Sequence, residues 1–227
     1  MGFDSSYPTP ILFNVLGLVL FTILKMGSNT LHSDHFDLQL PEADIKYYKN
    51  FLSEPEAAQY FKSLLDNLEW KQHNIKIFGK SLQQPRLTAL YGVTDDAYTY
   101  SGLTLHPLPF TEEMRAIQNK IKKIIAADFT HCLANLYRDG RDSMGLHADD
   151  ENELGKYPAI ASVSLGENRR FRLKHKFDKS LKLNIDLAPG SLLIMQGPTQ
   201  QFWKHELPKT SASKGTRINL TYRKILY

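Results

Sequence analysis

Hydrophobic residues recur at helical spacing in two parts of the first half of this chain. Ser53-Glu54-Pro55-Glu56 has the residue types of a capping box with proline in the first turn, and apolar residues then recur through Leu68. This pattern predicts a helix over residues 54–69. A second helix is predicted from Thr111, with one apolar stripe that would pack on a sheet. The stripe consists of Met114, Ile117, Ile121, Ile124 and Ile125.

Short apolar or alternating runs separated by turn residues dominate the second half. They span residues 133–138, 159–165, 169–176, 181–187, 191–196, 201–206 and 216–225. Short strands without intervening helices indicate a sandwich or a jelly roll, and they disfavour a parallel α/β sheet. The predicted fold class is therefore mostly β with flanking helices.

Length and composition fit one globular domain. The chain has 227 residues, of which 42% are hydrophobic and 23% are charged, so collagen-like, coiled-coil and disordered classes are disfavoured. Its single cysteine, Cys132, cannot form an intrachain disulfide or a CxxC zinc site, so a metal would need nitrogen and oxygen ligands. It also points to a reducing compartment: the cytoplasm, or the nucleus in a eukaryotic cell.

Charge is distributed unevenly along the chain. Residues 1–120 carry 10 Lys and Arg against 13 Asp and Glu, whereas residues 121–227 carry 18 against 11. We expect an anion-binding surface in the second half. Charge alone does not distinguish nucleic acid from anionic lipid or from a solvated surface.

The N-terminal run Ile11–Leu24 is almost entirely apolar, but it is shorter than the ~20 residues that a membrane-spanning helix needs. No stable membrane span is predicted, and the preceding residues lack the positive charge of a signal peptide. Gly2 and Ser6 fit a myristoylation pattern that is common by chance. We treat residues 1–40 as an N-terminal extension and 41–227 as the domain; a true translation start at Met26 is one explanation for residues 1–25.

His147-Ala148-Asp149 is a candidate metal-binding motif, because residues i and i+2 of a strand project on one face. The His-x-Asp pattern alone is weak, since it also occurs at His32–Asp34 and His35–Asp37, which we interpret as a polar connector. His205 follows a strand-like run downstream and offers a third ligand. Two histidines and one aspartate form the facial triad of non-haem Fe(II) oxygenases.

The last run, Arg217-Ile-Asn-Leu-Thr-Tyr-Arg223, alternates between polar and apolar residues. Arg217, Asn219, Thr221 and Arg223 share one face. A buried face with two arginines requires an anion. An exposed edge strand is the alternative interpretation of the same alternation.

Four motifs in this order resemble the AlkB family of Fe(II)/2-oxoglutarate-dependent dioxygenases: Asn135-x-Tyr137, His147-x-Asp149, His205 and the terminal RINLTYR run. The resemblance covers roughly residues 70–227 and implies a double-stranded β-helix (jelly-roll) core. It implies that iron is held by His147, Asp149 and His205. It also implies a 2-oxoglutarate site lined by Asn135, Tyr137, Arg217, Asn219, Thr221 and Arg223.

The activity implied by this resemblance is oxidative demethylation of N-alkylated bases in DNA, of the 1-methyladenine and 3-methylcytosine type. O2 and 2-oxoglutarate are consumed, and an aldehyde, succinate and CO2 are released. The distal carboxylate of 2-oxoglutarate needs a fixed cation. Arg217 and Arg223 are far enough apart along a strand to serve opposite ends of the ligand, or one could support the other.

Two segments resemble substrate-binding elements of the duplex-acting DNA-repair branch. Ile77-Phe78-Gly79-Lys80 resembles a hairpin finger with an aromatic wedge, although Phe78 could equally be a core aromatic near a turn. The segment 98–102 resembles a lesion-binding strand, which suggests a nucleotide-recognition lid over 70–102. An alkylated base is cationic, so nearby acids would favour it. The substrate-binding residues expected on these grounds are Phe78, Gly79, Lys80, Arg86, Tyr98, Tyr100, Asp150 and Glu151.

The run 170–176 alternates as well, so one basic stripe is predicted from Arg170, Arg172, Lys174 and Lys176. Such a stripe suits a phosphate backbone. Outer contacts are expected from Lys80, Arg86, Lys209 and Lys214. The expected partner is alkylated DNA, as a duplex, with RNA left open, and the protein is expected to be a monomer. The alternatives are an oxygenase for RNA or alkylated protein, and a non-catalytic jelly roll that binds nucleic acid.

Overall fold

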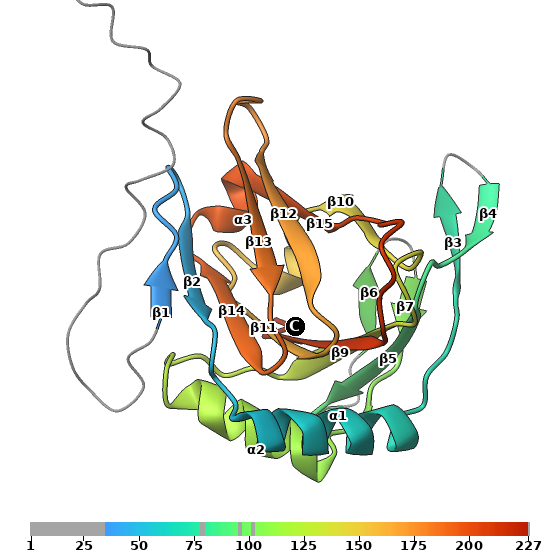
Figure 1. Ribbon diagram of the computed structural model, residues 1–227. Coiled ribbons are helices and arrows are strands. Elements are labelled where there is room, and N and C mark those ends of the chain that lie inside the picture. Colours follow the sequence, from blue (N-terminus) through green and yellow to red (C-terminus); the bar gives the residue numbers. More distant parts are fainter. Residues whose placement is uncertain (1–34, 78–79, 95–96, 101–102, 227) are drawn as a thin grey trace, which may run out of the picture.

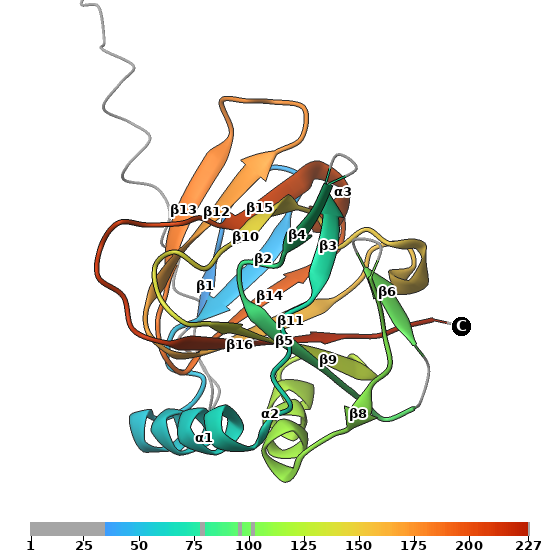
Figure 2. The same ribbon diagram turned by 90° about the vertical axis from the view of Figure 1, so that its right-hand side faces the viewer.

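The computed structural model describes residues 35–77, 80–94, 97–100 and 103–226. Two sheets face each other, and two helices cover the outer face of the larger sheet (Figures 1 and 2). Within the described residues, the large sheet has the order β1 (His35–Asp37), β2 (Asp44–Tyr48), β14 (Ser191–Gln196), β11 (Ile160–Gly166), β16 (Arg217–Arg223), β9 (His131–Tyr137), β5 (Leu87–Gly92) and β8 (Leu108–Pro109). The small sheet has the order β10 (Met144–His147), β15 (Trp203–Leu207), β12 (Arg169–His175) and β13 (Lys182–Leu187). Among the described strands, both sheets are antiparallel, apart from one parallel pair, β5–β8, in the larger sheet. This arrangement confirms the predicted jelly-roll core.

Two hydrophobic cores hold these layers together. The first lies between the helices and the large sheet, where Met114, Ile117 and Ile121 are fully buried. The second lies between the two sheets and is centred on Trp203 and Leu173. Each sheet contributes alternate side chains to this second core. A polar pocket can therefore lie between the sheets without exposing the inner face of either sheet to solvent.

Both predicted helices are present, and the second is shorter than expected. α1 spans Glu54–Asn67 and α2 spans Glu112–Lys122. The predicted apolar stripe extended to Ile124 and Ile125, which lie beyond the end of α2. At the end of the helix the N–H of Ile124 bonds to the carbonyl of Ile121, three residues back, so the last turn is tightened. Both isoleucines still pack against the outer core.

Each predicted strand run contains a strand, with one change. The run 201–206 begins in the short helix α3 (Thr199–Phe202) and becomes β15 only at Trp203. The terminal run is β16, which lies between β11 and β9, and all its residues are buried. The alternative interpretation of this run as an exposed edge strand is therefore wrong. A 3-10 turn at Asn152–Leu154 follows β10.

The first half of the chain differs more from the prediction. The predicted connector His35–Asp37 is an edge strand paired with β2, whereas His32 and Asp34 lie outside the described residues. The range 70–102 contains β3 (Asn74–Ile77), β4 (Lys80–Gln83), β5 and β6 (Tyr98–Tyr100), and β6 pairs with β7 (Leu103–Leu105). A lid in this range would therefore consist of two hairpins separated by β5, a strand of the large sheet. No helix among the described residues is long and apolar enough to cross a bilayer.

Glu56 in the first turn of α1 links this helix to α2. Glu56 accepts hydrogen bonds from the N–H and Oγ of Ser53 and from Lys120 Nζ of α2. The bond from Lys120, followed by those from Ser53, lowers the pKa of Glu56 from 4.5 to about 2. The carboxylate therefore stabilises the fold above about pH 4.5, and this stabilisation is lost as the pH falls through about 2.

We expect Glu56→Gln to lower the melting temperature at pH 7 by about 2–4 °C, the shift for about 1 kcal/mol in a chain of this size. Calorimetry from pH 7 down to pH 3 should show the difference from wild type shrinking. Glu54→Gln is the matched control, because among the described residues Glu54 makes no bond to α2. A pH-independent difference would contradict the electrostatic explanation.

Candidate metal centre and adjoining pocket

Three side chains from separate parts of the sequence converge between the two sheets. His147 ends β10, His205 lies on β15 and Asp149 follows β10. His147 Nε2 lies 3.8 Å from Asp149 Oδ1, and His205 Nε2 lies 3.9 Å from Asp149 Oδ2. One ligand atom from each residue lies within 4.8 Å of the others. This spacing suits one shared metal ion.

The local structure that brings them together differs from the prediction in one respect. Asp149 was expected to share a strand with His147, but β10 ends at His147 and Asp149 lies in the bend that follows. His147 pairs directly with His205 across the β10–β15 ladder, which has an irregular register here. The strand pairing therefore fixes the two imidazoles, whereas the bend places the carboxylate.

Each imidazole is oriented by a neighbouring group. His147 Nδ1 donates to the carbonyl of Gly145 at 2.8 Å, which leaves Nε2 facing Asp149. The His205 ring stacks on Phe171, with ring centres 5.2 Å apart. Fixing the tautomer and the ring plane in this way is a common feature of metal-binding histidines.

Electrostatics keep the triad in the protonation state that binds a metal. Burial, together with the charge of His147, lowers the pKa of His205 to about 3, so its imidazole is neutral. Burial alone would raise the pKa of Asp149, but the charge of Arg223 is the main cause that lowers it to about 2, and the hydrogen bond from Arg223 adds to this effect. Asp149 Oδ2 is buried and has no hydrogen-bond partner among the described residues. Burial also lowers the pKa of His147, so this imidazole is neutral as well. Two neutral imidazoles and an ionised carboxylate with an unused oxygen form a fitting ligand set for a divalent ion.

A pocket adjoins the triad and is lined by all nine residues that the sequence assigned to the metal and 2-oxoglutarate sites. They are Asn135, Tyr137, His147, Asp149, His205, Arg217, Asn219, Thr221 and Arg223. Neighbouring strands β9 and β16 present the polar part, because Asn219 pairs with Asn135 and Arg217 pairs with Tyr137. The rest of the wall is apolar, including Leu133, Met195 and Leu207.

The two arginines of β16 lie at opposite ends of this polar face. Arg223 Nη2 donates to Asp149 Oδ1 at 2.7 Å, so it belongs to the triad end. Arg217 Nη2 donates to Ser164 Oγ at 2.9 Å, and its guanidinium lies 5.3 Å from the centre of the Tyr137 ring. Arg217 Nε is buried without a hydrogen-bond partner among the described residues.

Residues that the sequence analysis did not single out complete the site. Ser162 Oγ accepts from Asn219 Nδ2 at 2.8 Å, and Ser164 Oγ accepts from Arg217. The spacing of these serines at i and i+2 in β11 puts both on one face, a signal that could have been used. Gln200 contacts the Asp149 main chain, and nothing in its local sequence indicates this.

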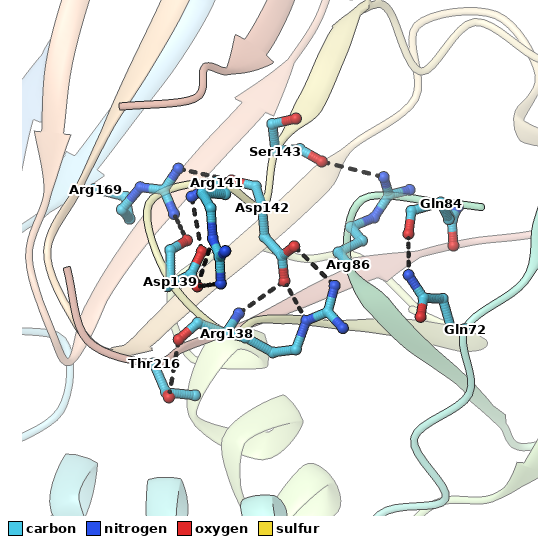
Figure 3. A network of polar contacts seen from close by, with 10 residues as sticks. All are labelled: Gln72, Gln84, Arg86, Arg138, Asp139, Arg141, Asp142, Ser143, Arg169 and Thr216. Atoms are coloured by element: carbon cyan, nitrogen blue, oxygen red, sulfur yellow. Dashed lines mark hydrogen bonds and ion pairs between the residues drawn. The ribbon is translucent and has the colours of Figure 1, made fainter. Parts of the chain in front are cut away.

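The loop 138–143, which connects β9 to β10, is held by a dense polar network (Figure 3). Arg138 bonds through its main-chain N–H and its guanidinium to the carboxylate of Asp142. Buried Arg169 donates to the main-chain carbonyls of Asp139, Asp142 and Pro208. These bonds attach the loop to β12 and fix the start of β10 at Met144, three residues before His147.

Arg86 lies inside the protein, not at its surface. It is 3% exposed, and its Nε donates to Asn135 Oδ1 at 2.7 Å. Its Nη1 donates to the carbonyl of Ser143 at 3.5 Å (Figure 3). The expectation of an outer contact to phosphate is wrong for this residue: it directly precedes β5, and its buried side chain bonds to Asn135 and Ser143 instead of facing solvent. A contact with substrate stays a prediction.

The other predicted substrate residues are described to different extents. Phe78 and Gly79 lie outside the described residues, and for Lys80, Tyr98 and Tyr100 the structure describes the strands but not the side chains. Asp150 is exposed and accepts from Lys176 Nζ at 2.8 Å, and Glu151 is half-buried. Burial, with the nearby charge of Asp149, raises the pKa of Glu151.

The basic stripe predicted over residues 170–176 is partly neutralised by acidic side chains. Its interpretation as a uniform row of cations is therefore wrong. Arg170 pairs with Asp186 at 3.0 Å, Lys174 with Glu206 at 2.8 Å and Lys176 with Asp150. Arg172 lies 3.8 Å from Glu206. Of the expected outer contacts, Lys209 is exposed and Lys214 pairs with Glu167. These partners come from strands β13 and β15 and from distant loops, so the run itself could not reveal them.

Comparison with known proteins agrees with this site. The 2OG-Fe(II) oxygenase superfamily matches residues 44–223. "Alpha-ketoglutarate-dependent dioxygenase alkB homolog 3" of Homo sapiens is 37% identical over 187 residues, which cover 78% of this chain and 65% of that protein. "DNA oxidative demethylase ALKBH2" of Bos taurus is 38% identical over 189 residues, covering 79% of this chain and 68% of that protein.

The protein of the latter name from Arabidopsis thaliana is 35% identical over 212 residues and covers 81% of this chain. The chain spans about two thirds of the length of these three relatives. Among solved structures, the one titled "The structure of OsALKBH1" matches with a TM-score of 0.59 at 18% identity, over 79% of this chain and 97% of that one. At this identity the match concerns the fold alone.

Asp149 is one of three candidate metal ligands and also forms a buried ion pair with Arg223, whereas His205 is a candidate ligand only. Variants of the two residues should therefore differ in stability. We expect His205→Ala and Asp149→Ala each to weaken Mn(II) binding at least about 100-fold, because each removes one of three ligands. Asp149→Ala should also lower the free energy of unfolding by about 3 kcal/mol, because it removes the carboxylate from a buried pair.

Calorimetric titration with Mn(II) and urea unfolding of the metal-free protein measure the two effects. His106→Ala, at an exposed histidine outside the triad, should change neither. Equal losses of stability in the Asp149 and His205 variants would contradict the role of the ion pair.

Proposed function

Because the chain belongs to the 2OG-Fe(II) oxygenase superfamily, and within it to the AlkB family, we propose that it oxidatively removes N-alkyl groups from bases in DNA. The expected lesions are of the 1-methyladenine and 3-methylcytosine type. The observation that carries the proposal is the convergence of His147, Asp149 and His205 beside a buried, arginine-bearing pocket. A relative named DNA oxidative demethylase supports DNA as the substrate.

The family's cofactor and co-substrate, Fe(II) and 2-oxoglutarate, fit the groups that line this pocket. The triad would hold the iron, since its ligand set leaves positions open for exchangeable ligands. Arg217 would bind the distal carboxylate of 2-oxoglutarate, because it is a buried cation at the end of the pocket away from the triad. Asn135 and Tyr137, on the neighbouring strand, would contact the same co-substrate.

Arg223 would act at the triad end. Its bond to Asp149 Oδ1 keeps the carboxylate ionised and directed, and its position suits the oxo-acid end of 2-oxoglutarate. Of the two arrangements that the sequence left open, this one puts the arginines at opposite ends of the co-substrate. Burial lowers the pKa of Arg217 to about 10, so it remains a cation at neutral pH.

With iron and 2-oxoglutarate bound, one atom of O2 enters succinate, CO2 is released, and the other oxygen atom hydroxylates the alkyl carbon, which leaves the base nitrogen as an aldehyde. The protein therefore needs no nucleophile of its own. Its residues orient the co-substrate and exclude water, and Phe171 and Leu207 supply apolar wall beside His205. Exclusion of water limits uncoupled consumption of 2-oxoglutarate.

Recognition of a cationic base would involve Glu151. Its Oε2 is buried without a hydrogen-bond partner among the described residues, two positions after the metal ligand Asp149. Asp150 is engaged by Lys176 instead, so Glu151 is the better candidate of the two acids. The roles of Phe78 as a wedge and of Tyr98 and Tyr100 beside the base stay predictions.

A row of three lysines supports a nucleic-acid partner. Lys174 of β12 lies directly opposite Lys182 of β13 and Lys204 of β15, on the outer face of the small sheet. Like charges at directly opposite positions repel each other, and Glu206 is the acid that offsets this row. A phosphate backbone across these strands would relieve the repulsion. Duplex preference, monomeric state and a cytoplasmic or nuclear location stay predictions.

The reaction itself is the direct test. Purified protein with Fe(II), ascorbate, 2-oxoglutarate and an oligonucleotide carrying 1-methyladenine or 3-methylcytosine should yield succinate, formaldehyde and the unmodified base. His147→Ala should abolish turnover, because one of three ligands is lost, and should leave DNA binding unchanged. Mass spectrometry of the oligonucleotide and a succinate assay measure the result.

The other outcomes distinguish the alternatives. Succinate formation only with RNA or with an alkylated protein would replace DNA as the substrate. DNA binding without any succinate would favour a non-catalytic nucleic-acid-binding jelly roll. Either result contradicts the proposed function.

The lysine row predicts a change in salt dependence. Replacing Lys174, Lys182 and Lys204 with Gln should reduce the log–log slope of DNA affinity against salt by about 2–3, because each phosphate contact contributes about 0.9. Fluorescence anisotropy at several salt concentrations measures the slope. The matched control replaces exposed Lys49, Lys62 and Lys123 with Gln, the same charge change away from this row. Equal slopes for the two variants would remove the row from the interface.

A further inference from the structure

The main-chain N–H of Asp149 needs an acceptor that the sheet does not supply. β10 ends at His147, so Asp149 lies outside the strand ladder, and its side chain is 2% exposed. Buried N–H groups without an acceptor are rare, because they lose their bond to water and gain nothing in return. Gln200 provides the acceptor: its Oε1 lies 2.9 Å from Asp149 N.

Gln200 is held in place from several sides. It is 1% exposed, and its Nε2 lies 3.7 Å from Met195 Sδ. The adjacent Thr199 Oγ1 donates to the carbonyl of Gln196 and accepts from the N–H of Asp44. These bonds attach α3 to the end of β14 and to β2, so the amide is presented from a fixed backbone.

The same segment continues directly into the strand that carries another ligand. α3 leads into β15 at Trp203, and His205 lies two residues further on. One short segment therefore bears His205 and also bonds to the main chain of Asp149. A shift of α3 would move the carboxylate and the imidazole together.

We infer that Gln200 is a positioning residue for the metal centre: its amide oxygen holds the Asp149 main chain so that this carboxylate and His205 meet at one point. The inference rests on the metal centre of the proposed function. Groups behind metal ligands commonly change metal affinity about 10–100-fold when they are removed. An alternative is that Gln200 merely fills space in the core.

Two substitutions at this position separate these roles. Gln200→Leu keeps a similar volume and removes the acceptor. Gln200→Glu keeps an acceptor oxygen whether or not its carboxyl group is protonated, so it should restore binding if acceptance of the N–H is what matters.

Gln196→Leu is the matched control. Gln196 ends β14, four residues before Gln200, and its amide donates to Asp44 Oδ2 at 2.7 Å instead of bonding to a residue of the metal centre. Loss of this bond loosens the attachment of the segment to β2. Any effect of general destabilisation on metal affinity should appear in this variant too.

Titration of the full-length, metal-free protein with Co(II), followed by visible absorption, measures affinity and ligand geometry in one experiment. We expect Gln200→Leu to raise the Co(II) dissociation constant about 10-fold and to alter the spectrum. Gln200→Glu should remain within about twofold of wild type, or bind more tightly through its added negative charge. Gln196→Leu should bind like wild type, while thermal unfolding shows both leucine variants destabilised.

Wild-type affinity and spectrum in Gln200→Leu would overturn the inference. Weak binding in Gln200→Glu would also overturn it, because an acceptor would then be insufficient. If wild-type protein bound no Co(II), the metal centre of the proposed function would fail. If Co(II) bound as expected but no substrate were demethylated, the proposed function would fail while the role of Gln200 stood.

Discussion

The pairing of His147 with His205 across β10 and β15 is the constraint on which the rest of the site depends. Because side chains alternate along a strand, a slip of one residue in this ladder would turn one imidazole to the outer face. The small sheet as a whole protects the register, since His205 also pairs with Leu173 of β12. The relative position of the two imidazoles is thus specified by strand pairing.

The third ligand obeys a different constraint. Asp149 lies beyond the end of β10, where no ladder fixes it, and three separate groups define its position: Arg223 at its carboxylate, Gln200 at its main chain and the strand end at His147. Burying a carboxylate is costly unless it is paired. The cation that neutralises it comes from β16, the strand that also lines the pocket, so assembly of the metal site and assembly of the pocket are coupled.

Sequence predicted those parts of the site that local periodicity controls. Alternation in β16 put Arg217 and Arg223 on one face, and the order of the motifs identified the triad. It failed where long-range pairing decides the outcome. The acids that neutralise the basic stripe lie on other strands or in a distant loop, and the groups that bury Arg86, just before β5, come from β9 and the loop 138–143. Such features depend on which strands become neighbours, and one residue run does not contain that information.

Three of the buried arginines near the site differ in their hydrogen-bond partners. This difference distinguishes arginines that hold the structure together from one that could bind a ligand. Arg169 donates to three main-chain carbonyls, so its hydrogen bonds are used in holding the loop 138–143. Arg223 is neutralised by Asp149. Arg217 is as deeply buried, yet it interacts with the Ser164 hydroxyl and with Tyr137, and its Nε has no hydrogen-bond partner among the described residues. A buried guanidinium without an anion is costly, and this cost supports the proposal that Arg217 binds a carboxylate of the co-substrate.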